Sequence, residues 1–351
     1  MENVPIQRGL TFDDVLLEPR KTSVKRHEVD VSTKISKNIT ITVPLIAAAS
    51  DTVSEPALAV ALAEEGGIAV IHRNCGVEEQ VRMITEAKKA GARVGGAIGP
   101  TDVERALALD GAGADVVVMD CAHAHADGII DAARKIKQSI RADFIIGNIA
   151  TREAAEDFAD FADGLKVGIG PGSICTTRIV SGVGVPQLTA IHNVVSVASK
   201  KGIPVIADGG IRFSGDIVKA LAMGASAVML GSLFAATREA PGEVIEVKGK
   251  MFKVYRGMGS KEALEKRHAT DRYQQEAGNH TPEGISGMVP YRGTVHDVAL
   301  ELVNGVRSGM GYVGARTIPD IARQARFIQI TSAGLLESHP HSLTMQPERP
   351  E

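Results

Sequence analysis

Residues 204–232 read PVIADGGIRFSGDIVKALAMGASAVMLGS, and the order of their apolar and polar segments decides the fold. An apolar run ends in Asp-Gly-Gly, a longer segment that looks helical follows, and a second apolar run ends in Gly-Ser. Short runs that are apolar throughout are typical of strands buried on both faces of a parallel sheet. The stretch therefore predicts two parallel strands joined by a helix.

The same alternation recurs along the chain and yields eight apolar runs, which is the number of strands in a (β/α)8 TIM barrel. The runs begin at Val43, Gly67, Arg93, Asp115, Asp143, Gly164, Pro204 and Ala227. Candidate helices lie at 55–65, 77–90, 102–111, 128–140, 189–200, 295–306 and 318–326. We predict one α/β barrel domain over residues 1–351. A doubly wound open sheet is the alternative, but no Gly-x-Gly-x-x-Gly motif opens a helix after an early strand.

Residues 244–293 interrupt this pattern after the eighth predicted strand. The segment has poor periodicity and many glycines, and it is too long for an ordinary connector. We interpret it as a long mobile flap, that is, a functional lid, with a disordered insertion as the alternative.

The composition excludes several classes of partner. The 351 residues carry a formal net charge of -3 without a block of like charge, so the chain lacks the electrostatic footprint of a protein that binds nucleic acid or anionic membranes. No apolar segment resembles a signal peptide or is long enough to span a bilayer. The three cysteines are far apart and form no CxxC pair, which indicates a reducing compartment. We expect a cytoplasmic protein with a small polar ligand.

In such a barrel the functional groups lie where strands end and βα loops begin. The ends of predicted strands four to eight carry Asp120, Asn148, the Cys175 loop, Asp208-Gly209-Gly210 and Gly231-Ser232. Unhindered glycine N–H groups after strands seven and eight favour a phosphate site, to which Ser173 and Ser232 can add hydroxyl donors. Asp208 beside it suits a ribose diol. Taken singly, each glycine pair also fits a tight turn, and Asp208 also fits a helix N-cap.

The most glycine-dense loop, VGIGPGSICTTR at 167–178, contains one of the three cysteines. Glycines allow close approach of a ligand, and backbone dipoles favour a thiolate, so Cys175 is the candidate nucleophile. Thr176 and Thr177 can hold a proton-transfer water or a carboxylate. We interpret Cys75 and Cys121 as inert buried residues. No base is fixed by spacing, because the AHAHA stretch with His123 and His125 also fits a half-exposed loop.

At this point the motifs identify a family. They are GLTFDDVLLEP from Gly9, GIAVIHRN from Gly67, GIGPGSICTTR from Gly168, GVGVPQ from Gly182, ADGGIRFSGDIVKALAMGA from Ala207, VMLGSLFA from Val228, YRGMGS from Tyr255 and ESHPH from Glu337. Together they make nearly the whole chain similar to the inosine monophosphate (IMP) dehydrogenase and guanosine monophosphate (GMP) reductase superfamily.

The resemblance implies a role for each matching residue. Cys175 would attack C2 of the purine, and Asp208 would bind the ribose. The other substrate-binding residues would be Ser173, Gly209, Gly210, Gly231, Ser232, Tyr255, Gly257, Met258, Gly259 and Glu283. The cofactor NAD would contact Asp120, Asn148, Gly168 and Gly170. A potassium ion would bind main-chain oxygens of Gly170, Gly172 and Cys175, with Glu337, Ser338 and His339 from a neighbouring subunit of a homotetramer.

Dehydrogenase and reductase share the cysteine loop, and the flap separates them. Here DRYQQ supplies Arg272 and Tyr273, and the flap has the length and the PEG sequence of the dehydrogenase. The resemblance therefore implies oxidation of IMP to xanthosine monophosphate (XMP) in guanine nucleotide biosynthesis, through a covalent thioimidate. Because a guanidinium is hardly ever a free base, water activation by Arg272 with Tyr273 stands beside a Thr177 to Glu283 proton route.

Three departures from the family pattern remain. The family's regulatory pair of cystathionine-synthase-type (CBS) domains is missing at its expected insertion point near 89–92. Ser50 stands where both enzymes place a methionine, and DCAHAHADG replaces a more usual DTAHGHS. GMP reductase is therefore kept as an alternative, and a purine nucleotide-binding protein without turnover as another.

Overall fold

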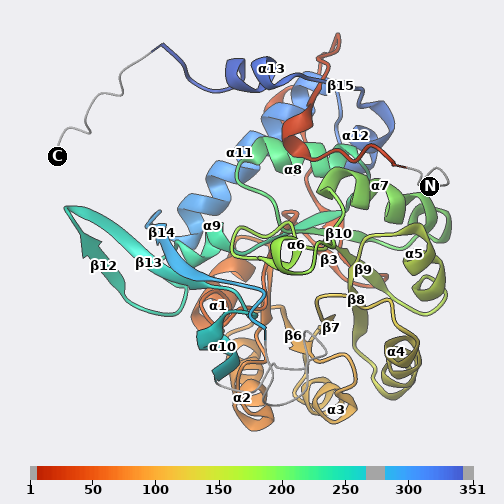
Figure 1. The fold of residues 1–351 in the computed structure, drawn as a ribbon, viewed down its shortest axis with the longest axis vertical. Coiled ribbons are helices and arrows are strands. Elements are labelled where there is room, and N and C mark those ends of the chain that lie inside the picture. Colours follow the sequence, from red (N-terminus) through yellow and green to blue (C-terminus); the bar gives the residue numbers. More distant parts are fainter. Residues whose placement is uncertain (1–5, 266–280, 343–351) are drawn as a thin grey trace.

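The computed structural model describes residues 6–265 and 281–342, and its centre is a closed barrel of eight parallel strands (Figure 1). Around the barrel the strands follow the order β10-β11-β4-β5-β6-β7-β8-β9, so the first strand along the chain, β4, pairs with the last, β11. All eight predicted strands are confirmed. They are β4 (Leu45–Ala47), β5 (Ile68–Ile71), β6 (Val94–Ile98), β7 (Val116–Asp120), β8 (Asp143–Ile149), β9 (Gly164–Val167), β10 (Val205–Asp208) and β11 (Ala227–Leu230).

Helices alternate with these strands and surround the barrel (Figure 1). The larger ones are α1 (Pro56–Glu64), α2 (Val77–Lys89), α3 (Val103–Gly111), α4 (Asp127–Ser139), α5 (Arg152–Phe158), α7 (Gln187–Ala198), α8 (Ser214–Ala222), α11 (Val295–Val313) and α12 (Ile318–Gln324). The predicted helices are confirmed to within a few residues, except that α11 is longer than expected. Its glycines serve packing, because a Cβ at Gly309 would lie 2.7 Å from the Val218 side chain of α8. Gly314, at φ 83°, then ends the helix.

Two apolar layers follow from the alternation of side chains along each strand. In β7, Val116 and Val118 belong to a cluster inside the barrel, whereas Val117 and Met119 pack toward the helices. A short hairpin of β2 (Thr33–Lys34) and β3 (Thr40–Ile41) contributes to the inner cluster through Ile41 and through Ile35, which follows β2. The barrel interior is therefore a packed core, and ligand space is left to the loops at the strand ends.

The segment predicted as a flap contains an antiparallel sheet of β12 (Val244–Val247), β13 (Lys250–Arg256) and β14 (Ser286–Pro290). This sheet extends away from the barrel in Figure 1. Lys248 and Gly249, at φ 53° and 77°, form the two-residue connection between β12 and β13, as primed hairpin turns require. The described part of 244–293 therefore contains regular structure, which contradicts the alternative of a disordered insertion. The role of the segment as a mobile lid stays a prediction. Arg272 and Tyr273 lie outside the described residues.

The remaining elements close the ends of the fold. β1 (Val15–Leu17) pairs antiparallel with β15 (Phe327–Gln329), which joins the N-terminal segment to the C-terminal one. Residues 90–93 lead from α2 directly into β6.

Across residues 6–265 and 281–342, no helix combines the length and apolar character needed to span a membrane. The short helices are α6 (Thr177–Val180), α9 (Ser232–Ala235), α10 (Lys261–Glu265), α13 (Ser332–Glu337), η1 (Phe12–Asp14), η2 (Arg26–Glu28) and η3 (Ser199–Lys201).

Candidate active site

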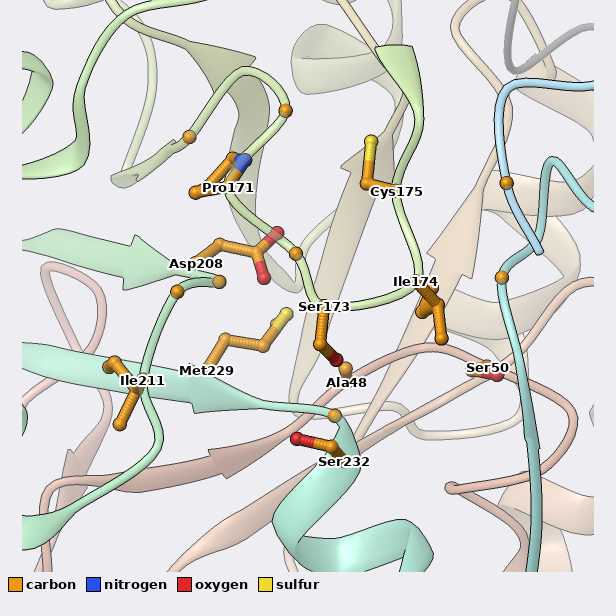
Figure 2. Close-up of a pocket in the computed structure, with 18 of the residues that line it drawn as sticks. Ala48, Ser50, Pro171, Ser173, Ile174, Cys175, Asp208, Ile211, Met229 and Ser232 are labelled. Atoms are coloured by element: carbon orange, nitrogen blue, oxygen red, sulfur yellow. The ribbon is translucent and has the colours of Figure 1, made fainter. Parts of the chain in front are cut away.

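A cavity of about 370 Å³ lies at the carboxyl ends of the barrel strands, and Figure 2 shows the loops that surround it. Ser173, Ile174 and Cys175 follow one another on a single loop, while Asp208 and Ser232 stand at the ends of neighbouring strands. Most of the predicted site residues line this one cavity. They are Asp120, Asn148, Gly168, Gly170, Gly172, Ser173, Cys175, Thr177, Asp208, Gly209, Gly210, Gly231, Ser232, Tyr255, Gly257, Met258 and Glu283.

Cys175 is the accessible thiol of the three. It lies on the loop between β9 and α7, is only partly buried, and donates a hydrogen bond to the Thr177 hydroxyl over 3.2 Å. Cys75 and Cys121 are buried, and burial raises the pKa of both thiols to about 11. The interpretation of Cys75 and Cys121 as buried is confirmed, and Cys175 is the one of the three that lines the cavity.

Residues 283–285, which precede β14 and which we call the flap root, form hydrogen bonds with the cysteine loop. The N–H of Ile285 donates to the Ile174 carbonyl over 2.9 Å, and the N–H of Thr176 donates to the Glu283 carbonyl over 3.0 Å. These bonds form an isolated antiparallel bridge between Cys175 and Gly284. The residues before β14 thus fix the backbone on both sides of the thiol.

The glycines after β10 and β11, which are Gly209, Gly210 and Gly231, form a cradle without side chains. Gly209 and Gly210 have φ of 90° and 80°, a region that side chains disfavour. A Cβ on Gly231 would lie 2.2 Å from the Tyr255 hydroxyl, so only glycine fits there. Burial is the main cause that raises the pKa of Tyr255, so this phenol stays a neutral hydrogen-bonding group. Ser173 hydrogen-bonds to it. The unhindered glycines and the hydroxyls of Ser173 and Tyr255 therefore line the same cavity, a combination that suits a bound anion.

Sequence reasoning missed Lys166, which organises the floor of the site. Its ammonium group donates to the carboxylates of Asp120 over 2.9 Å and of Asp208 over 2.7 Å, and it also donates to the side-chain amide oxygen of Asn148. The side chain is 1% exposed. A lysine in an otherwise apolar strand was the available signal, because a buried ammonium needs carboxylate partners. Residues predicted for ribose and for NAD are thus joined in one network.

Some predicted residues lie elsewhere. Gly259 is absent from the cavity lining but accepts a hydrogen bond from the N–H of Glu283. Glu337 ends α13, Ser338 follows it, and the His339 ring lies 6.0 Å from that of Phe213 in the same chain. All three of these residues are likewise absent from the cavity lining.

Two sequence departures can also be placed. Ser50 lines the cavity, and its hydroxyl donates to the main-chain carbonyl of Arg256 over 3.2 Å. His125 is paired with Asp157 of α5 over 2.8 Å, and His123 stacks edge-on to it at 6.3 Å. Neither histidine lines the cavity, so neither stands ready as a base for Cys175.

Fold and site together define a (β/α)8-barrel protein with glycine turns after its last two barrel strands and an accessible cysteine that lines the same cavity. Comparison with known proteins narrows this class. The family model described as IMP dehydrogenase / GMP reductase domain matches residues 9–341, and the chain belongs to this family.

Several curated relatives are similar along their whole length, and each is named inosine-5′-monophosphate dehydrogenase. The relative from Cryptosporidium parvum is 44% identical, over 98% of this chain and 97% of its own. The relative from Borreliella burgdorferi is 44% identical, over 98% and 99%. The relative from Halobacterium salinarum is 38% identical, over 99% and 96%. The last alignment spans 481 positions, more than the 351 residues here, so that relative carries segments that this chain lacks.

Proposed function

We propose that this chain catalyses the NAD-dependent oxidation of IMP to XMP. Membership in the family and full-length similarity to proteins named IMP dehydrogenases make it an oxidoreductase of this kind. The observation that carries the finer proposal is that Cys175 lines the same cavity as the glycine cradle of β10 and β11. A nucleotide anchored there by its phosphate has its base within the reach of one thiol.

The reaction requires a balanced sequence of bonds. The Cys175 thiolate adds to C2 of the purine, a hydride leaves C2, and the resulting thioimidate is hydrolysed by water, which releases XMP and the thiol. NAD, when bound, accepts the hydride. Asp208 holds the ribose hydroxyls, and Lys166 keeps that carboxylate in place. Ala122, Gly168 and Gly170 are among the residues that line the cavity, and their small or absent side chains leave room for a planar ring beside the substrate.

The potassium site is also a proposal. Main-chain carbonyls are ligands of the kind that potassium takes, and Gly170, Gly172 and Cys175 belong to one tightly folded loop. The remaining ligands would be Glu337 to His339 of a neighbouring copy in a homotetramer, as the family resemblance implies. The three free cysteines suit a cytoplasmic protein.

Water activation has two candidates. The Thr177 hydroxyl touches the nucleophile, and Glu283 belongs to the segment paired with the same loop, which supports a proton route through this pair. We expect Glu283→Gln to slow hydrolysis of the intermediate about tenfold or more, with little effect on the first burst of NADH. Arg272→Ala is the comparison, and stopped-flow absorbance separates the two steps. Equal slowing of both steps by either variant would remove that residue from the water-activating role.

The direct assay is NADH absorbance with IMP, NAD and potassium. A folded protein without turnover would contradict the proposal. The family description also covers GMP reductase, for which the assay is ammonia release from GMP with NADPH. Nucleotide binding without either reaction would favour the remaining alternative, a purine nucleotide-binding protein without turnover.

A further inference from the structure

The cysteine loop and the phosphate loop separate at one point in the barrel. Strands β9 and β10 are paired up to Val167 and Ala207. Beyond this register the chain enters the Cys175 loop on one side and the Asp208–Gly210 turn on the other. We call this point of divergence the fork. The separation between the Cys175 thiol and the proposed ribose and phosphate sites depends on the contacts that hold the fork together.

Gln187 fills the fork. Its side-chain amide nitrogen donates to the Val167 carbonyl over 2.9 Å and to the Asp208 carbonyl over 3.0 Å. Because both partners are acceptors, only the NH2 end of the amide can occupy this position. The side chain is fully enclosed, with 1% of the residue exposed.

Burial of the Gln187 amide costs free energy of folding, because one of its two polar atoms is left without a partner in the described part of the chain. Within the described residues, its carbonyl oxygen is buried and has no hydrogen-bond partner. An apolar residue of similar length would avoid that burial. Gly168 shows how tight the fork is, because a Cβ there would lie 2.2 Å from the Asp208 carbonyl oxygen and 3.2 Å from the Gln187 amide nitrogen.

Gln187 also closes the cysteine loop on itself. The loop starts after Val167 and ends at Gln187, the first residue of α7, so the amide joins the two ends. Arg178 braces the same loop further along, since its guanidinium donates to the Ile169 carbonyl over 3.2 Å and to the Val185 carbonyl over 2.6 Å. The thiol therefore sits on a loop that is closed at its base and tied there to β10.

We propose that Gln187 is a positioning residue, which fixes Cys175 relative to the ribose and phosphate sites and thereby sets the rate of attack on the purine. This inference rests on the proposed function. It assigns Gln187 no contact with the substrate. Its loss changes the alignment of the reacting atoms and leaves the phosphate cradle in place.

The test is Gln187→Met, which preserves length and removes the donors. We expect the single-turnover rate of NADH formation to fall about tenfold or more, because misplacement of a reacting group by about 1 Å has effects of this size. The dissociation constant of IMP should change less than about threefold, since the cradle is intact. The matched control is Asn193→Leu, which removes an amide donor to the Ala150 carbonyl from the same helix and should alter neither quantity.

A folded Gln187→Met protein with an unchanged rate would overturn the proposal, as would a loss of IMP affinity by the same factor as the rate. Should this variant fail to fold, Gln187→Glu takes its place, because its carboxylate would face the two carbonyls. If the unaltered protein forms no NADH, the proposed reaction fails separately. The rate at which iodoacetamide alkylates Cys175 then decides: a change of threefold or more supports the positioning role, and an equal rate rejects it.

Discussion

At the scale of single residues, the sequence did not predict that Lys166 pairs with Asp120 and Asp208 beside the cavity. Asp120, Asn148 and Asp208 were predicted as site residues because they end strands, and this rule needs no tertiary information. Lys166 lies within a buried strand, where a lysine is unusual. Its role depends on hydrogen-bond partners from three other strands. Such a partner set exists only once the barrel is closed.

Lys166→Met tests this network. The substitution removes the positive charge between the buried Asp120 and the partly buried Asp208, so we expect it to lower the free energy of unfolding by about 3 kcal/mol at pH 7. Urea unfolding at pH 7 measures this loss.

Lys253→Met is the matched control for that substitution. Lys253 is also 1% exposed, but its ammonium group contacts the main-chain carbonyls of Arg238 and Ala240. We expect a smaller loss of stability, because the partners left behind are neutral carbonyls and not carboxylates. Equal losses of stability for the two variants would show that the paired carboxylates at Lys166 have no special role.

At the scale of elements, prediction succeeded where strands are apolar throughout and failed where they alternate weakly. The eight barrel strands were found because strands buried on both faces leave a local signal. The sheet of β12, β13 and β14 was missed because most of its residues are at least partly exposed and charged residues such as Lys250 and Arg256 interrupt its apolar pattern. The Lys248-Gly249 turn was its one clear local signal.

The pairing of the flap root with the cysteine loop gives a prediction at this scale. Ile285→Pro deletes the N–H that donates to the Ile174 carbonyl, so we expect steady-state NADH formation to fall about tenfold through loss of thiol alignment. Ile285→Ala keeps the N–H and truncates a side chain that is 52% exposed, so its activity should stay within about twofold. Similar activities of the two variants would contradict this account of the loop.

At the scale of the whole molecule, a buried carboxylate stabilises the end of the barrel at which the strands begin, opposite to the cavity. Asp143 begins β8 and accepts hydrogen bonds from Ser36 and Asn38, beside the hairpin of β2 and β3. Burial acts to raise the pKa of Asp143, but these hydrogen bonds outweigh it and hold the pKa below its ordinary value of 3.8. This residue therefore stabilises the fold fully above about pH 4, and the stabilisation is lost as the pH falls below that value.

Asp143→Asn should consequently lower the free energy of unfolding by about 1–3 kcal/mol at pH 7. The difference from the unaltered protein should narrow below pH 4, where Asp143 itself becomes protonated. Thermal unfolding between pH 3 and pH 7 measures both effects. A difference that stays constant over this range would mean that the charge of Asp143 does not matter.

The barrel as a whole was predictable because its evidence is repeated eight times along the chain, whereas assembly leaves no comparable local mark. The expected contribution of Glu337 to His339 to a neighbouring copy stays a prediction. So does the role of Arg272 and Tyr273.

Mass spectrometry of the Cys175 peptide, after quenching the protein during turnover with IMP and NAD, tests the central claim most directly. We predict that this peptide gains the mass of a purine nucleotide, that Cys75 and Cys121 do not, and that Cys175→Ala binds IMP without turnover. NADH production by the Cys175→Ala protein, or turnover without any adduct on Cys175, would contradict the account.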